Sequence, residues 1–186
     1  PHLGARAQWL DALPPSFSGA VIANEVLDVL PVHLVSFANG GVFELGVVVA
    51  NAGEGQCFSW RSRLLQDGPL AAGSGRILST YLGDPRPQSY TTEICLAAPA
   101  WVNSLAAMLE RGAILLIDYG FRAAEYYHPG RTQGTLMCHY RHYAHTDPFY
   151  LPGLQDITSH VDFTRVAEAG RAAGMDLLGY TTQGNF

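Results

Sequence analysis

The amino-acid sequence predicts an α/β fold, and three of its features lead to that prediction. Residues 19–23 and 112–118 are short, continuous apolar runs, a pattern typical of strands that are covered on both faces in a parallel sheet. A helical pattern over residues 93–110 precedes the second run, which gives the strand, helix, strand order of an α/β protein. Residues 32–60 differ and predict antiparallel hairpins around the turn at residues 39–41, because Asn-Gly is the strongest short hairpin signal.

The remaining elements of the first half follow from residues that start or stop regular structure. Residues 7–10 predict a short strand that two prolines then end, and residues 25–30 predict about one and a half helical turns before the next proline. Residues 66–90 are rich in Gly, Pro and Ser and predict a surface loop with a short helix at residues 77–82. Thr and Glu at residues 91–93 are expected to cap the helix that follows.

The last third of the chain begins with a long irregular segment. Residues 121–160 are rich in aromatic and histidine side chains with few periodic runs, which is typical of a lid or a binding element. Residues 161–174 predict a helix with Asp162 near its start and Gly174 at its C-terminal cap. Residues 175–182 predict a final strand.

Length and composition limit the class of protein. The chain has 186 residues, of which 48% are hydrophobic and 15% charged, against about 25% charged in average proteins. Disorder and coiled coil are therefore excluded, and the length predicts one domain with one core. No apolar run reaches the roughly 18 residues of a membrane span, so we expect no membrane insertion. The first residues lack an initiator Met and a signal-peptide pattern, which indicates a chain cut from something longer.

Charge and cysteine usage exclude further classes. All 11 basic residues are arginine and stand against 16 acidic ones, for a net charge of −5. Without a basic patch, a nucleic-acid partner is not expected. The three cysteines form no CxxC pair, so we expect neither a disulfide framework nor a cysteine zinc site, and a reducing compartment fits best. The sequence contains no GxSxG, P-loop or HExxH motif, so nucleophilic hydrolysis and phosphate binding have no support.

Polar residues follow all three strands predicted for a parallel sheet. They are Asp11 after the first, Asn24 and Glu25 after the second, and Asp118 and Tyr119 after the third. Each alone could be a cap or a turn residue. Because ligands bind beyond the carboxyl ends of parallel strands, the set together favours a ligand crevice.

A histidine-rich stretch raises the alternative of a metal site. His139, His142 and His145 are three residues apart and Cys138 lies beside the first, a set of transition-metal ligands. The interleaved tyrosines favour irregular or extended structure, in which the three rings would diverge, so we predict no metal. Hydrogen bonding within a loop, or substrate contact by His139, Arg141 or His142, remain the other interpretations.

Four motifs, taken in order, resemble one known family. The sequence is similar to the C-terminal part of the MidA-type S-adenosylmethionine-dependent methyltransferases in WLDALP, VIANEVLDVLPVHLV, LLIDYG and GTLMCHYRHYAHTDPFYLPGLQDITSHVDFTRV. The resemblance implies the C-terminal portion of a Rossmann-like class I methyltransferase fold, mostly parallel, with residues 32–60 as an antiparallel β insertion and residues 121–160 on the substrate side. Residues 1–186 would then be a partial methyltransferase domain. The N-terminal cofactor-loop region, with its glycine-rich loop and acidic ribose-binding residue, would be absent, so the fragment alone is expected to be inactive.

The resemblance also assigns a cofactor and residues that bind it. S-adenosyl-L-methionine is the expected cofactor. By position in the fold, Asp11, Ala12 and Leu13 would lie near the adenine. Asn24 and Glu25 would face the methionine end, where an acceptor can hold the positively charged amino group.

A mitochondrial relative in the family assists assembly of respiratory complex I by methylating a protein arginine, which implies a guanidinium acceptor. Guanidinium is charged at any working pH, so paired carboxylates would hold it and receive the proton that it releases. The carboxylate candidates are Glu25, Asp28, Asp118, Asp156 and Asp162. Glu25 and Asp28, three residues apart at a strand end, come first, with His139 and Arg141 as further substrate contacts, whereas Asp162 could equally be a helix residue.

Competing functions stay open beside this one. The expected partner is a protein substrate such as a respiratory-complex subunit, in the cytoplasm of a bacterium, and a homodimer is one option. A noncatalytic assembly or binding module with the same fold is the main alternative, and a histidine-bound metal hydrolase is the third.

Overall fold

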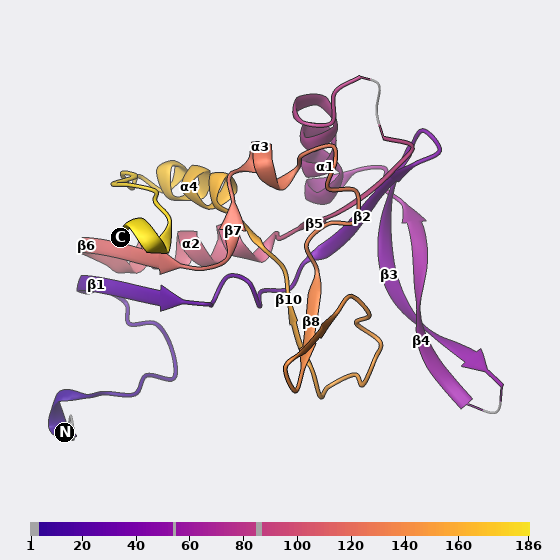
Figure 1. Ribbon diagram of the computed structural model, residues 1–186. Helices are drawn as coiled ribbons and strands as arrows, with labels where there is room; N and C mark the ends of the chain where they lie inside the picture. The colour runs from indigo at the N-terminus through magenta and orange to yellow at the C-terminus, as the bar shows by residue number, and fades with distance from the viewer. Residues whose placement is uncertain (1–3, 54, 85–86) are drawn as a thin grey trace.

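The computed structural model describes residues 4–53, 55–84 and 87–186 and shows a mixed α/β protein (Figure 1). Its helices are η1 (Gly4–Arg6), α1 (Gly68–Thr80), α2 (Ala97–Met108), α3 (Ala123–Tyr126), α4 (Phe163–Ala172) and η2 (Gln183–Asn185). Its strands are β1 (Phe17–Asn24), β2 (His33–Ala38), β3 (Gly41–Ala52), β4 (Gly55–Leu64), β5 (Ser89–Ile94), β6 (Leu109–Ile117), β7 (Gly120–Phe121), β8 (Met137–Tyr140), β9 (Tyr143–His145), β10 (Asp156–Thr158) and β11 (Val161–Asp162). No described helix is both long and apolar enough to cross a membrane.

The two apolar runs form a parallel strand pair, as predicted. β1 and β6 pair in register up to Asn24 opposite Ile117, so both strands end at the same edge. Gly19 and Gly112 face each other within this register. Gly112 has a φ of 150°, and a Cβ there would overlap the carbonyl oxygen of Gly19, so the close approach of the two strands depends on glycine.

A second, antiparallel sheet has the strand order β4-β3-β2-β5 and contains the predicted hairpins. Asn39 and Gly40 take φ values of 52° and 73°, the left-handed pair that a type I′ turn requires. β4 continues to Leu64, past the predicted end at residue 60. In Figure 1 the β3–β4 ribbon extends away from the rest of the molecule.

The predicted starts of two helices were wrong. Residues 91–93 lie in β5 instead of capping a helix, because β2 offers this segment a partner strand along its whole length. Helix α2 begins only at Ala97, with Pro99 in its first turn, where a missing N–H costs no hydrogen bond. Helix α1 covers Gly68–Thr80 instead of residues 77–82, since a proline at the start of a helix favours it rather than breaking it.

Helix α4 and the two residues predicted to mark its ends were predicted correctly, although the helix covers Phe163–Ala172 and residues 161–162 form β11. The carboxylate of Asp162 accepts a hydrogen bond from the backbone N–H of Arg165 at 3.2 Å, as an N-cap does. Gly174 has a φ of 85°, and the N–H of Met175 donates to the carbonyl of Gly170 at 2.9 Å, which ends the helix in a Schellman motif.

Three predicted elements are absent from the described residues, and one loop contains more structure than expected. Residues 7–10 and 175–182 have no partner strand and are irregular, and residues 25–30 form turns instead of a helix. A short apolar run becomes a strand only where backbone partners are available, and these two runs have none there. Residues 121–160, expected to be irregular, contain α3 and the three-stranded sheet β10-β8-β9.

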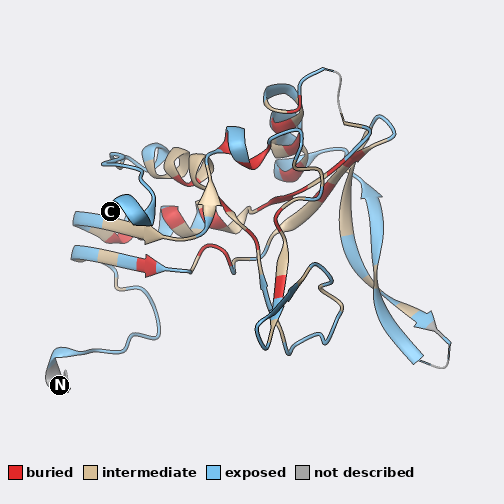
Figure 2. Ribbon diagram, in the orientation of Figure 1, coloured by how far each residue is buried: buried red, intermediate tan, exposed pale blue. Residues whose placement is uncertain are grey.

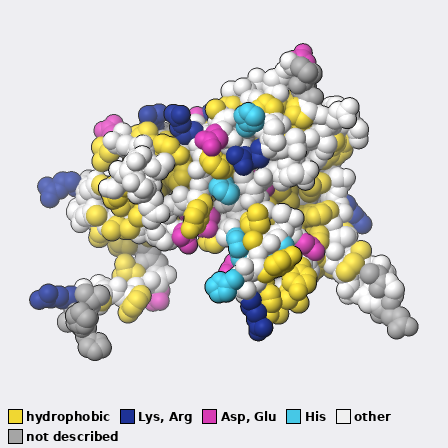
Figure 3. All heavy atoms as spheres, viewed as in Figure 1, with side chains coloured by type: hydrophobic (Ala, Val, Ile, Leu, Met, Phe, Trp, Pro, Cys, Tyr) yellow, Lys and Arg dark blue, Asp and Glu magenta, His cyan; other side chains and the backbone are white. Residues whose placement is uncertain are grey.

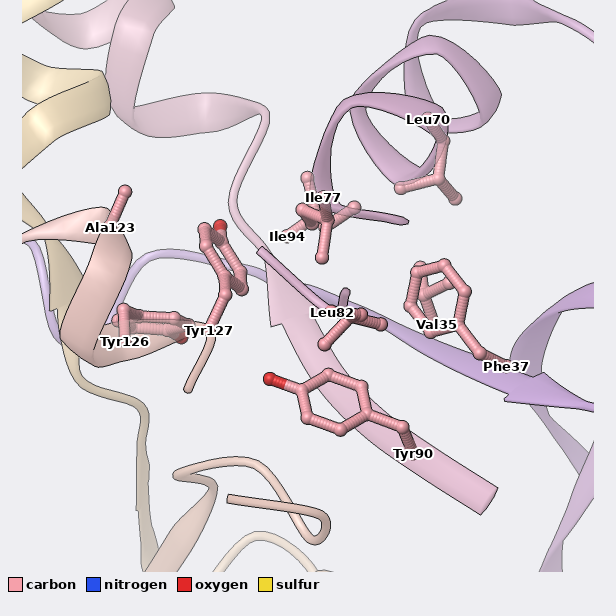
Figure 4. Packing of buried hydrophobic residues seen from close by; sticks show 10 residues of the cluster. All are labelled: Val35, Phe37, Leu70, Ile77, Leu82, Tyr90, Ile94, Ala123, Tyr126 and Tyr127. Atoms are coloured by element: carbon pink, nitrogen blue, oxygen red, sulfur yellow. The ribbon is translucent and has the colours of Figure 1, made fainter. Parts of the chain in front are cut away.

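Two apolar clusters hold these elements together (Figure 2). The larger lies between the antiparallel sheet, α1 and α3, and Figure 4 shows Tyr90 of β5 beside Leu82, with Tyr126 of α3 and the adjacent Tyr127 in the same cluster. The smaller joins α2, α4 and β11 to the turn after β1 through Leu27. The turn that follows β1 is therefore anchored in the smaller cluster by Leu27.

Candidate functional site

Asp118 shapes the turn that follows β1. One oxygen of its carboxylate, Oδ2, accepts from the backbone N–H groups of Val26, Leu27 and Asp28 at 3.1, 2.9 and 3.3 Å. The other oxygen accepts from the N–H of Tyr119 at 2.8 Å. Both oxygens of Asp118 are thus bound to backbone, and they draw the residues after β1 toward the end of β6.

Glu25 starts this turn in a strained conformation. Its φ is 50°, a left-handed value that costs a residue other than glycine about 1 kcal/mol or more. Its N–H donates to the carbonyl of Ile117 at 2.9 Å, which continues the β1–β6 pairing by one residue. The strain places an exposed carboxylate directly beyond the carboxyl ends of the two parallel strands, as expected of a functional residue.

Asp28 is the buried member of the acidic cluster, by which we mean Glu25, Asp28 and Asp118. The residue is only 7% exposed, and its Oδ1 is buried without a hydrogen-bond partner. Burial raises the pKa of the Asp28 carboxyl above its usual range, and the charges of Asp118 and Glu25 raise it further. A buried acceptor beside two more carboxylates favours a cationic ligand. Such a ligand would offset both the burial of the Asp28 carboxylate and its repulsion by Asp118 and Glu25.

Tyr119 lies on the open side of this cluster. Its side chain is 61% exposed. The nearby charge of Glu25 raises the pKa of the Tyr119 hydroxyl, so the phenol stays protonated and can donate a hydrogen bond.

The histidine-rich segment, residues 121–160, contacts the acidic cluster at the backbone of Asp28. The N–H of Ser159 donates to the backbone carbonyl of Asp28 at 2.9 Å, and β10, which precedes Ser159, pairs with β8. His139 of β8 stands opposite Asp156 of β10, and both are exposed. Arg141 lies at the distal turn between β8 and β9, with its guanidinium 5.3 Å from the ring centre of Tyr140.

The structure therefore brings together one part of the predicted site and not another. Asn24, Glu25, Asp28 and Asp118 meet at the ends of β1 and β6. Asp11, Ala12 and Leu13 are exposed in an irregular segment that reaches β1 at its starting end (Figure 1). Asp162 caps α4, and burial raises the pKa of its carboxyl.

The three histidines are spread along the β8–β9 hairpin. His139 lies in β8, His142 in the turn and His145 in β9, where its ring contacts Tyr143 and Tyr150. The described residues contain no group of three or more His, Cys, Asp or Glu side chains arranged to hold a metal ion.

Sequence reasoning missed Glu93. The sequence predicts it as part of a helix cap, but it lies in β5 with 1% of its surface exposed and accepts hydrogen bonds from Thr135 and Leu136. The alternation of aromatic and β-branched residues around it predicts a strand, and a glutamate inside such a strand indicates a buried, hydrogen-bonded carboxylate. Figure 3 shows acidic and histidine side chains together along the middle of one face of the molecule.

A parallel strand pair with an acidic cluster at its carboxyl end, next to a histidine-rich hairpin, defines a mixed α/β protein with a candidate ligand site beyond its strand ends. The chain belongs to the family described as "putative S-adenosyl-L-methionine-dependent methyltransferase", whose model matches residues 1–181. The family expected from the four motifs is thereby confirmed, and with it S-adenosyl-L-methionine as the family's cofactor.

Named relatives agree with this assignment. The chain is 31% identical over 189 residues to the "Protein arginine methyltransferase NDUFAF7 homolog, mitochondrial" of Drosophila melanogaster, covering 98% of this chain and 40% of the relative. It is 51% identical, with a TM-score of 0.85, to a crystal structure of a "likely methyl transferase" from Burkholderia thailandensis bound to S-adenosyl-homocysteine, covering 96% of this chain and 44% of that one. A native crystal structure from the same organism matches with the same identity and TM-score. The chain spans less than half the length of these relatives.

Proposed function

We propose that this chain supplies the acceptor side of an S-adenosyl-L-methionine-dependent methyltransferase and that the methyl acceptor is an arginine of a partner protein. The observation that supports it most is the buried Asp28 carboxyl, whose Oδ1 has no partner and which lies beside the exposed carboxylate of Glu25. A guanidinium has five N–H donors and a permanent charge, so it satisfies both carboxylates at once.

The parallel pair β1–β6 is the part of the fold that supports a Rossmann-like class I arrangement, with residues 32–60 as the β insertion. In such a sheet the cofactor would be held beyond the strand ends. Asn24 and Glu25 stand there and would receive the methionine end, while Asp11, Ala12 and Leu13 are assigned to the adenine by the family resemblance alone. The acidic cluster suits the positive charges of the amino group and the sulfonium.

S-adenosyl-L-methionine supplies an electrophilic methyl group when bound. The residues of this chain would bind the acceptor and take up its proton. Glu25 and Asp28 would hold the guanidinium, and one of them would receive the proton that the acceptor nitrogen loses. Asp118, with both oxygens bound to backbone, would keep the turn in place. Alignment of acceptor and methyl group is expected to supply much of the rate, so a rigid turn is the main contribution.

The segment 121–160 is proposed to contact the substrate protein, with His139 and Arg141 as the residues that touch it. Both are exposed on the β8–β9 hairpin. The name of the Drosophila relative supports a protein arginine as acceptor. A respiratory-complex subunit as substrate, a bacterial cytoplasmic location and a homodimer stay predictions.

Calorimetric titration of S-adenosyl-homocysteine tests this proposal. The titration uses the chain itself and a chimera in which residues 1–186 replace the matching part of the Burkholderia relative. We expect the chimera to bind and Glu25→Gln to weaken binding by about tenfold, the effect of losing one charge-assisted hydrogen bond. Asp67→Asn, which removes an exposed carboxylate at the start of α1 whose side chain makes no capping hydrogen bond, is the matched control.

Methyl transfer to arginine and lysine peptides by the same chimera identifies the acceptor. Transfer to arginine that is lost in Asp28→Asn supports the proposed site. Failure of a folded chimera to bind the cofactor product, or transfer to lysine alone, would contradict the proposal, and the first of these would favour the noncatalytic assembly module.

A further inference from the structure

Glu93 is a buried carboxylate that is held by neutral donors. It accepts from the backbone N–H of Thr135 at 2.9 Å, from the N–H of Leu136 at 2.9 Å and from the Thr135 hydroxyl at 3.0 Å. The hydroxyl of Tyr126 donates to it at 3.2 Å. The described ion pairs do not include Glu93, so these donors are what compensates the burial of its oxygens.

Gly134 makes this arrangement sterically possible. Its φ is 74°, and a Cβ at this position would overlap Oε1 of Glu93. The backbone of residues 134–136 therefore wraps around the carboxylate at a distance that only glycine allows. We call this arrangement of Glu93, Gly134 and Thr135 the clasp.

Residues 159–161 connect the clasp to the acidic cluster. The Thr135 hydroxyl, which donates to Glu93, also accepts from the backbone N–H of His160 at 3.1 Å. The two neighbouring N–H groups point the other way: that of Ser159 donates to the carbonyl of Asp28 at 2.9 Å, and that of Val161 to the carbonyl of Tyr119 at 2.8 Å. Residues 159–161 thus bridge the clasp on one side and the residues after β1 and β6 on the other.

His160 adds a second restraint on this segment. Its ring stacks on Phe121 of β7 with the ring centres 5.0 Å apart, and the guanidinium of Arg131 lies 4.5 Å from the centre of the same phenyl ring. The stack holds the His160 side chain against β7, and among the described hydrogen bonds the acceptor of the His160 backbone N–H is the Thr135 hydroxyl.

We propose that the Thr135 hydroxyl, oriented by Glu93, is a positioning group that holds residues 159–161 and through them the backbone of Asp28. This role rests on the proposed function, because it matters for activity only if Asp28 contacts the acceptor. Loss of the hydroxyl frees the His160 N–H and leaves one oxygen of Glu93 with fewer donors. The turn that carries Glu25 and Asp28 then loses its fixed distance from the histidine-rich hairpin.

Two substitutions at one position isolate the hydroxyl. Thr135→Ser keeps the oxygen that joins Glu93 to His160, whereas Thr135→Val keeps the volume and removes the oxygen. Tyr126→Phe is the control: it removes a different donor to Glu93, together with the 3.3 Å hydrogen bond between the Tyr126 and Thr135 hydroxyls, and leaves the Thr135 oxygen and its bond from His160 in place. Glu93→Gln, which turns one acceptor oxygen into a donor, gives a second route if Thr135→Val does not fold.

Amide hydrogen exchange measures the positioning directly. In Thr135→Val or Glu93→Gln we expect the amides of Ser159 and His160 to exchange about five- to tenfold faster than in the unmodified protein, the effect of one lost hydrogen bond. Thr135→Ser and Tyr126→Phe should stay within about twofold. Unchanged exchange in Thr135→Val, or equal acceleration in Thr135→Ser, would overturn the proposal.

Kinetics of the chimera separate this proposal from the proposed function. We expect Thr135→Val to lower kcat about tenfold or more with KM for S-adenosyl-L-methionine within about twofold, because misplacement of a reacting group lowers the rate of the chemical step, and Thr135→Ser should restore it. Unchanged kcat with faster exchange would overturn the link to activity. If Glu25→Gln retains full activity, the proposed site is wrong, and the exchange data still decide whether Thr135 holds residues 159–161.

Discussion

Asp28→Asn is expected to stabilise the protein while it removes function. The Asp28 side chain is 7% exposed, its Oδ1 has no partner, and the charges of Asp118 and Glu25 lie close enough to raise its pKa. An unsatisfied buried polar group costs about 1–3 kcal/mol. Asparagine keeps the shape, removes the charge and adds an N–H donor beside two carboxylates. We expect a gain of about 1 kcal/mol at pH 7, which raises Tm by about 2–4 °C in a chain of this size.

The sign of the pH dependence gives a second criterion. The folded-state pKa of Asp28 is raised above its unfolded value near 3.8. The carboxyl therefore contributes stability that is fully present below the unfolded pKa and is lost as pH rises through the folded pKa. The advantage of Asp28→Asn should be largest at neutral pH and should shrink as pH falls toward 3.8.

Thermal unfolding of Asp28→Asn, Asp67→Asn and the unmodified chain from pH 7 to pH 4 tests this prediction. Asp67→Asn removes the same charge from an exposed position and should change Tm by less than about 1 °C. A loss of stability in Asp28→Asn, or a gain that does not depend on pH, would refute the reasoning. If Asp28→Asn stabilises the chain and the same substitution abolishes methyl transfer by the chimera, the site carries a stability cost for its function.

Two further predictions concern the scaffold. Gly112→Ala should lower the free energy of unfolding by about 2 kcal/mol or more, because its Cβ would meet the carbonyl of Gly19. Gly75→Ala in α1 has open space around it and should raise the free energy of unfolding by about 0.5–1 kcal/mol. Urea unfolding measures both changes. Hydrogen bonds from His33 and Arg63 hold the pKa of Glu44 below its usual 4.5, so its stabilisation is present above pH 4.5 and is lost as pH falls through the folded-state pKa. Glu44→Gln should remove this part of the acid dependence, an effect below about 1 kcal/mol at a surface site, and an unchanged acid profile would contradict it.

Local sequence signals predicted an element correctly where the signal and the groups it contacts lie close together along the chain. Asn39 and Gly40 determine a hairpin because both favour left-handed φ values. Asp162 and Gly174 mark the two ends of α4 because each satisfies backbone groups of its own helix. These predictions needed no information about the rest of the fold.

The failures concern segments whose state depends on distant partners. Residues 91–93 have the composition of a helix cap, but β2 pairs with them, and sheet pairing outweighs a weak local preference. Residues 175–182 have the composition of a strand and find no partner among the described residues. Glu93 and Thr135 are 42 residues apart and meet only through the fold, so no spacing rule could have joined them.

The three carboxylates of the acidic cluster differ in what they can still bind. That difference distinguishes a residue that holds the turn from residues that can contact a ligand. Asp118 has both oxygens occupied by backbone N–H groups, so it acts on the turn and has little capacity left for a ligand. Asp28 keeps one buried oxygen without a partner, and Glu25 is exposed and strained. In the proposed site, a cation that enters the cluster would therefore meet Glu25 and Asp28, and we propose that Asp118 contributes by fixing the position of those two residues.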